Sequence, residues 1–167
     1  MKNISRKAFF AATAAGAISM MLPGGSSILK AQEVKKKPDA LDKDLVKDFV
    51  TKGHTDINGV KELLTQEPGL LNACWDWGGG DFETAIEGAG HMGNKENANF
   101  LISNGARMNI FCAAMLGQMD IVKGFLVMSP ELKSSKGPHG LQLLHHAKKG
   151  GEENYAMVQY LESIGAG

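Results

Sequence analysis

The chain has 167 residues, of which 18 are Lys or Arg, 18 are Asp or Glu and two are cysteine. A balanced formal charge lacks the basic excess of nucleic-acid-binding proteins and excludes that class. Two cysteines, Cys74 and Cys112, are too few for a disulfide-rich scaffold. The sequence leaves open whether they pair with each other.

Residues 1–31 have the layout of an export signal. Lys2, Arg6 and Lys7 precede an uncharged run from Ala8 to Leu22. The run is shorter than the roughly 20 apolar residues that a membrane-spanning helix needs. We therefore expect export by a Tat-like or Sec route, removal of the signal, and a periplasmic or secreted protein with no stable membrane insertion.

The chain after the predicted signal divides into a short linker, residues 32–40, and one domain, residues 41–167. It holds 14 Lys and Arg against 18 Asp and Glu, a formal charge of −4. The basic run Lys35-Lys-Lys37 has fewer charges than an electrostatic membrane anchor usually needs, so we interpret it as solvated.

Within this domain, four consecutive segments read alike. Each predicts a short helix, a glycine-containing turn and a second helix that ends in apolar residues. The first helix pair is expected at about 42–52 and 60–68, and the next three pairs at 84–102, 109–126 and 143–161. Asp42, Asp56, Asn109 and Asp120 stand where helix-starting side chains belong.

These segments resemble the ankyrin repeat, with the best matches in Ala113-Ala-Met-Leu-Gly117, Asp120-Ile-Val-Lys-Gly-Phe-Leu126, Leu144-His-His-Ala147 and Asn104-Gly-Ala-Arg-Met-Asn109. Glu87 and Phe111 replace the histidine of the consensus. The resemblance implies an all-α solenoid of about four repeats with short hairpin or finger loops. It also implies a non-catalytic protein–protein interaction module with no cofactor and a protein partner. Self-association stays open, because the last repeat lacks an obvious polar cap.

The connector between the first two repeats, residues 75–81, contains both tryptophans and three consecutive glycines. Glycines supply the positive φ angles of a hairpin tip, and alternation along a strand places Trp75 and Trp77 on one face. The indoles either cover the helices or anchor a partner. We predict partner binding by five residues of the two longest connectors: Trp75, Asp76, Trp77, Asp81 and His139.

The acidic residues of this region only weakly indicate a catalytic or calcium site. They are Asp76, Asp81, Glu83 and Glu87. Only Asp81 and Glu83 approach the spacing of a calcium loop. We expect Glu87 to bond to neighbouring backbone. The chain also lacks a P-loop and any nucleophile spacing, so we predict that it is not an enzyme.

Five histidines, at positions 54, 91, 139, 145 and 146, raise the question of a metal site. No local zinc motif is present, because His145 and His146 point in different directions on a helix. We expect His145 to bridge repeats by hydrogen bonds. If the finger loops line one face, His139 and the tryptophans share a surface with His91. An exported ligand- or metal-binding protein, including a small hydrolase, is therefore the alternative to protein binding.

Overall fold

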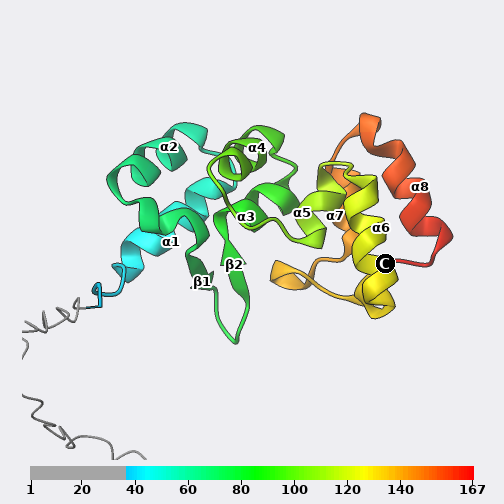
Figure 1. The fold of residues 1–167 in the computed structure, drawn as a ribbon, viewed down its shortest axis with the longest axis horizontal. Coiled ribbons are helices and arrows are strands. Elements are labelled where there is room, and N and C mark those ends of the chain that lie inside the picture. Colours follow the sequence, from blue (N-terminus) through cyan, green and yellow to red (C-terminus); the bar gives the residue numbers. More distant parts are fainter. Residues whose placement is uncertain (1–36) are drawn as a thin grey trace, which may run out of the picture. The chain divides into compact units, whose positions relative to one another are not determined.

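Eight α-helices in four consecutive pairs dominate residues 37–167, the part of the chain that the computed structural model describes (Figure 1). The predicted predominance of helices is confirmed. The pairs are α1 (Lys43–Gly53) with α2 (Ile57–Gln66), α3 (Ala85–Met92) with α4 (Lys95–Ser103), α5 (Ile110–Met115) with α6 (Met119–Met128), and α7 (Leu143–Lys149) with α8 (Tyr155–Ser163).

Residues 1–36 are not described, so the predicted export signal and most of the predicted linker lie outside the described residues. Residues 39–167 form one compact unit. Among the described helices, none combines the length and the apolar character that crossing a bilayer requires.

Side chains begin several helices where the sequence predicts it. The carboxylate of Asp42 accepts hydrogen bonds from the backbone N–H groups of Asp44 and Leu45 at the start of α1. Asp56 and Asn109 do the same at α2 and α5. Asp120 differs, because α6 already begins at Met119 and Asp120 lies in its first turn.

The helices pack in two ways, within each pair and between successive pairs. Each odd-numbered helix packs against the helix that follows it, and the odd-numbered helices pack against one another in the order α1, α3, α5 and α7. Small residues make this close packing possible. At Gly53, for example, an added Cβ would lie 2.6 Å from the Cα of Ala85, so α1 and α3 approach nearly backbone to backbone.

Two longer connectors protrude on the same side of the helices (Figure 1). The first is a hairpin of β1 (Cys74–Asp76) and β2 (Phe82–Thr84), antiparallel and with Trp75 opposite Glu83. Its tip has φ angles of 129°, 68° and 89° at Gly78, Gly79 and Gly80, as the sequence predicts. The second runs between α6 and α7 and contains the short turns η3 (Pro130–Ser134) and η4 (Pro138–Gly140).

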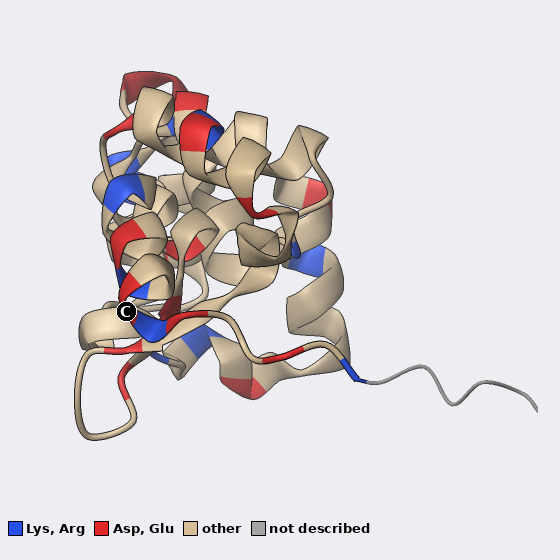
Figure 2. Cartoon of the chain, turned by 90° about the vertical axis from the view of Figure 1, so that its left-hand side faces the viewer, with Lys and Arg blue, Asp and Glu red and all other residues tan. Residues whose placement is uncertain are grey.

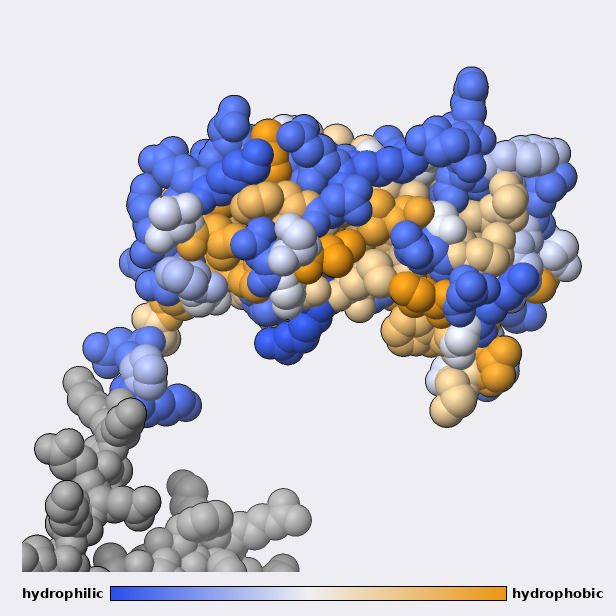
Figure 3. All heavy atoms as spheres, turned by 45° about the horizontal axis from the view of Figure 1, so that its top comes forward, coloured by the Kyte–Doolittle hydropathy of each residue, from blue (hydrophilic) through white to orange (hydrophobic). Residues whose placement is uncertain are grey.

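Two further short turns complete the description, η2 (Pro68–Asn72) before the hairpin and η5 (Glu152–Asn154) before α8. Acidic and basic residues are interspersed over the helices, without a face of one sign in the view of Figure 2. Hydrophobic side chains interrupt the hydrophilic surface in Figure 3. Among the large hydrophobic residues on the described helices, Val127 and Met128 at the end of α6 are the most exposed.

Candidate metal centre

Three histidines and one glutamate from four different elements converge at the base of the β1–β2 hairpin. His54 follows α1, Glu83 is the middle residue of β2, His91 lies in the last turn of α3, and His139 lies in η4. Each offers one nitrogen or carboxylate oxygen, and these four atoms all lie within 4.8 Å of one another. Residues far apart in the sequence therefore form one compact group.

Glu83 is the centre of this group. Its Oε1 lies 2.9 Å from Nε2 of His91 and 3.5 Å from Nε2 of His139, and its Oε2 lies 3.4 Å from Nε2 of His54. The side chain is fully buried, with 0% of its surface exposed. A carboxylate is rarely buried to this extent unless it is paired or coordinates a metal ion.

The strand explains why this glutamate points inward. Successive residues of a strand face opposite sides, so Phe82 is exposed while Glu83 is buried. The indole Nε1–H of Trp77, which follows β1, donates a hydrogen bond of 2.7 Å to Oε2 of Glu83. Oε2 is thus held by Trp77 and lies near His54, whereas Oε1 faces His91 and His139.

The electrostatics of the group favour the ionised form of Glu83. Burial alone raises the pKa of this carboxyl, because it removes the charge from water. The close approach of His91, the charge of His54 and the hydrogen bond from Trp77 outweigh burial and hold the pKa of Glu83 below its usual range. The group therefore contains a buried negative charge that cations stabilise.

Backbone and carboxylate acceptors orient two of the imidazoles. Nδ1 of His54 lies 3.0 Å from the carbonyl oxygen of Val50 and 3.1 Å from that of Thr51. Nδ1 of His139 lies 2.8 Å from Oδ2 of Asp81. These oxygens only accept hydrogen bonds, so Nδ1 is the donor in both rings and Nε2 is the nitrogen that faces Glu83.

His91 completes the group from the side of α3. Its Nε2 and Oε1 of Glu83 are both buried, and neither atom has a well-aligned hydrogen-bond partner despite their separation of 2.9 Å. The carbonyl oxygen of His91 accepts a hydrogen bond of 3.2 Å from Nε2 of His145 in α7. The predicted hydrogen bonding of His145 is thus confirmed as a link between α7 and α3.

The backbone at His139 adopts a conformation that is unusual for a residue with a side chain. His139 has a φ of 58°, in the left-handed region that favours glycine. It lies between buried Pro138 and Gly140, and its backbone N–H donates a hydrogen bond of 2.8 Å to Oδ1 of Asp81. This hydrogen bond is the largest of the influences that lower the pKa of Asp81. Residues held in such conformations concentrate at functional sites.

A glycine makes room for the group. An added Cβ at Gly88 of α3 would lie 2.8 Å from Cε1 and from Nδ1 of the His54 ring. The absence of a side chain at this position allows the imidazole to pack against α3 and to face Glu83. The position of His54 therefore depends on both α1 and α3.

The five residues predicted to bind a partner lie in the two protruding connectors, and the structure gives them different surroundings. Trp77, Asp81 and His139 belong to or touch the histidine group. Trp75 is half-buried, with Nζ of Lys47 5.6 Å from its ring centroid. Asp76 is exposed and accepts hydrogen bonds from the backbone N–H groups of Gly78 and Gly80. Binding of a protein partner by these residues remains a prediction.

The remaining candidates have local structural roles. Glu87 accepts hydrogen bonds of 2.8 and 2.7 Å from the backbone N–H and the hydroxyl of Thr84 and one of 2.7 Å from Nδ2 of Asn109, so its predicted structural role is confirmed. Cys74 is exposed and Cys112 is buried, and both are free thiols. Burial raises the pKa of Cys112 to about 12, which makes this thiol unreactive.

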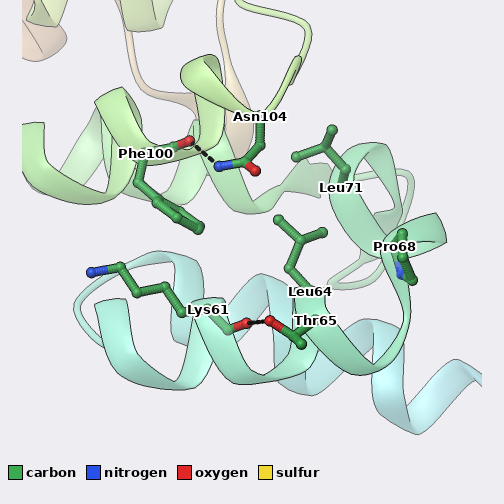
Figure 4. A pocket seen from close by; sticks show the side chains of 7 residues that line it. All are labelled: Lys61, Leu64, Thr65, Pro68, Leu71, Phe100 and Asn104. Carbon is green, nitrogen blue, oxygen red and sulfur yellow. Dashed lines mark hydrogen bonds between the residues drawn. The ribbon is translucent and has the colours of Figure 1, made fainter.

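A separate concavity lies between α2 and α4 (Figure 4). It is lined by Lys61, Leu64, Thr65, Pro68, Leu71, Phe100 and Asn104. The polar side chains of Thr65 and Asn104 bond to their own helices, to the carbonyl oxygens of Lys61 and Phe100. Its lining includes no buried polar atom that lacks a hydrogen-bond partner among the described residues, in contrast to the histidine group.

Sequence reasoning placed His91 and His139 on a common surface but did not join them to His54 and Glu83. The sequence suggests only a weak calcium-ligand role for Glu83. It does not predict that Glu83 is buried, because this burial depends on the register of the strands. A usable signal existed in the alternation of Phe82, Glu83 and Thr84 opposite two tryptophans, which places one carboxylate on the indole face. Comparisons with protein-family models, with curated proteins and with solved structures find no match to the chain.

Proposed function

We propose that the protein binds one divalent transition-metal ion, with Zn²⁺ as the best match, through His54, Glu83, His91 and His139. The observation that carries this proposal is the convergence of three imidazole Nε2 atoms on one fully buried carboxylate, with all four ligand atoms within 4.8 Å of one another.

The separations between the atoms fit a tetrahedral ion. Ligands about 2.0–2.1 Å from a central Zn²⁺ are about 3.3 Å apart in a regular tetrahedron. Oε1 of Glu83 lies 2.9 Å from Nε2 of His91 and 3.5 Å from Nε2 of His139, and all four ligand atoms lie within 4.8 Å of one another. Small side-chain adjustments therefore suffice to place an ion between the four groups.

Charge balance also favours a bound metal ion over protonation of all three histidines. The ring centroid of His91 lies 4.8 Å from that of His54 and 5.1 Å from that of His139. Three imidazolium ions at these separations repel one another, and the carboxylates of Glu83 and Asp81 neutralise only two of them. A divalent cation held by Glu83 and three neutral imidazoles would be balanced by the carboxylates of Glu83 and Asp81, and it would satisfy every inward-facing ligand atom.

The ligand types narrow the choice of metal. Calcium and magnesium bind six or more oxygen ligands, and this group offers one carboxylate among three nitrogens. Imidazole suits zinc, copper, nickel and iron, and a tetrahedral arrangement is typical of zinc. Four protein ligands fill the tetrahedral positions, as in structural zinc sites, so we assign the centre a binding and stabilising role and not hydrolysis.

The proposal also includes the type of repeat that the helix pairs form. We infer that the four helix pairs are ankyrin-like repeats, because the first helices stack in order and both long connectors protrude on one side. The export signal predicted at residues 1–31 would deliver the domain to the periplasm or outside the cell. The ion would then join the connectors of two non-adjacent repeats in an exported stack.

Protein binding by the same connectors is the second candidate. It draws support from Phe82 in the hairpin, whose surface is 59% exposed although it is a large hydrophobic residue. Aromatic residues are enriched at protein interfaces. A Phe82→Ser variant that melts like wild type should lose a partner that the wild-type chain retains in affinity capture from a periplasmic extract.

Metal titration tests the first candidate directly. The full chain, purified without a histidine tag and stripped with a chelator, should bind one Zn²⁺ per chain in competition with a chromophoric chelator. Saturation at a hundredfold excess over the Kd should stabilise the fold by about 2.7 kcal/mol, a rise in melting temperature on the order of 10 °C. Mg²⁺ and Ca²⁺ should leave both measurements unchanged.

Two variants localise the binding. His91→Ala should abolish stoichiometric binding, because it removes the buried nitrogen nearest to Glu83. His145→Gln is the matched control, since His145 lies outside the four ligand residues and glutamine retains a donor for the carbonyl of His91. Absence of stoichiometric binding by the wild-type chain, or equal binding by His91→Ala, would contradict the proposal.

A further inference from the structure

The geometry points to Asp81 as the positioning residue of the proposed centre, which fixes the tautomer and the orientation of His139 and so determines the affinity for the ion. This inference rests on the proposed metal function and deepens it. Asp81 itself is not a ligand of the group. It acts only through His139, to which it is joined by two hydrogen bonds across 58 positions of the sequence.

His139 needs this support more than the other three ligands do. His54 directly follows α1, and Glu83 and His91 lie in β2 and α3; these three elements pack against one another. His139 lies in a three-residue turn of the last connector, and its side chain is 34% exposed, against 19%, 0% and 9% for the others. Its φ of 58° also opposes the conformation that an isolated chain prefers.

Asp81 provides the support with both carboxylate oxygens. Oδ1 accepts the backbone N–H of His139, which stabilises the left-handed turn, and Oδ2 accepts Nδ1–H of the imidazole. Each bond is 2.8 Å long. The second bond keeps the proton on Nδ1 and leaves Nε2 free to ligate. A carboxylate in this position also raises the basicity of the ring as a ligand.

Asp81→Asn tests the role because the amide keeps the shape of the side chain and changes its chemistry. The amide oxygen can still accept the backbone N–H of His139. The amide NH₂ then faces Nδ1 and favours the tautomer with the proton on Nε2, which cannot ligate. Loss of such a supporting carboxylate lowers metal affinity by about 10–100-fold. We expect a fall of this size in zinc affinity for Asp81→Asn.

The hairpin supplies a matched control. Asp76 is a carboxylate of the same hairpin, and its hydrogen bonds go to the backbone of Gly78 and Gly80. Asp76→Asn makes the same change of charge and retains an oxygen acceptor for these bonds. Its zinc affinity should stay within about threefold of wild type, because the substitution leaves every ligand and its orienting partner in place.

A double-mutant cycle separates positioning from a general structural effect. His139 is the most exposed of the four ligands, so in a His139→Ala background the other three should still hold zinc more weakly. In that background Asp81→Asn should change the zinc affinity by less than about threefold, because the residue on which Asp81 acts is absent. An Asp81→Asn effect below about threefold in the wild-type background, or an equal effect in both backgrounds, would overturn the inference. If the wild-type chain binds no zinc, the proposed function itself fails, so the two failures are distinguishable.

A measurement on the wild-type chain tests the same inference without depending on the folding of any variant. The ¹⁵N chemical shifts of the histidine ring nitrogens in the zinc-loaded protein report which nitrogen carries the proton. For His139 we expect a protonated, hydrogen-bonded Nδ1 and a metal-bound Nε2. A metal-bound Nδ1, or a proton on Nε2, would overturn the positioning role of Asp81.

Discussion

The indole N–H of Trp77 donates a hydrogen bond of 2.7 Å to Oε2 of Glu83, a carboxylate with no exposed surface. This contact joins the hairpin, which looks from the sequence like an exposed aromatic finger, to the buried charge of the histidine group. It also leaves Oε1 as the oxygen that faces His91 and His139. The tryptophan therefore has a defined structural role whether or not it also binds a partner.

Replacing Trp77 should therefore destabilise the fold. Trp77→Phe retains a ring but removes the donor to a buried charge, and we expect a loss of about 1–3 kcal/mol in the free energy of unfolding in metal-free buffer. Urea denaturation measures the change. Trp75→Phe is the control, because Trp75 is half-buried and makes a cation–π contact with Lys47. A smaller loss for Trp77→Phe than for Trp75→Phe would contradict the assigned role.

The two tryptophans should also report metal binding unequally. The Trp77 ring centroid lies 6.3 Å from that of His54 and 6.1 Å from that of His139, so a paramagnetic ion held by these residues quenches Trp77 efficiently. We expect Cu²⁺ or Co²⁺ to quench most of the fluorescence of a Trp75→Phe variant, in which Trp77 alone remains. Equal quenching in Trp75→Phe and Trp77→Phe would place the ion elsewhere.

Stability should fall in mild acid because of His146. Its side chain is 1% exposed, its Nδ1 donates to the carbonyl of Gln142, and burial lowers its pKa to about 4. The unfolded chain takes up this proton near pH 6.5, whereas the folded protein does not. The contribution of neutral His146 is complete above that pH and is lost as the pH falls toward about 4.

Between pH 7.5 and pH 5 this single group should reduce the free energy of unfolding by about 2 kcal/mol. The carboxylates with lowered pKa also lose stabilising energy in acid, so the measurement compares wild type with His146→Gln in the presence of a chelator. The difference in stability between the two proteins should shrink by about that amount at the lower pH. A constant difference across this range would show that His146 titrates normally.

Two glycines offer opposite tests of the packing. Gly53→Ala should destabilise the fold by about 1–3 kcal/mol, because the new methyl group collides with the backbone of Ala85 and separates α1 from α3. Gly124→Ala should stabilise α6 by up to about 1 kcal/mol, since its Cβ meets nothing within 4 Å. Thermal melts of both variants measure the difference. Similar effects of the two substitutions would contradict the close approach of α1 and α3.

The sequence predicts the helices well because their signals are local. Asp42 and Asn109 precede apolar periodic runs and cap helices in the structure. The three glycines of the hairpin tip adopt positive φ as predicted. The resemblance to a repeat predicts a bridging hydrogen bond from His145, and His145 of α7 does bond to the carbonyl oxygen of His91 in α3. The caps and the glycine turn depend on a few neighbouring residues, and the expectation for His145 depends on similarity between segments of the sequence.

The histidine group was only partly predictable because its members meet through tertiary packing. His54 and His139 are 85 positions apart in the numbering, and no spacing rule connects them. Their meeting depends on the stacking of α1 on α3 and on the path of the connector before α7. The left-handed conformation at His139 could not be predicted, because the residue there is not a glycine. Asp81 of another element stabilises this conformation by a hydrogen bond to the backbone N–H of His139.

The most direct test of the central claim is a crystal structure of the zinc-loaded full chain with anomalous data collected on both sides of the zinc absorption edge. We predict one strong anomalous peak within about 2.0–2.2 Å of Nε2 of His54, His91 and His139 and of Oε1 of Glu83. A structure with the four side chains in place and no peak between them, or with zinc bound elsewhere, would contradict the claim and leave Glu83 as a buried carboxylate neutralised by histidine alone.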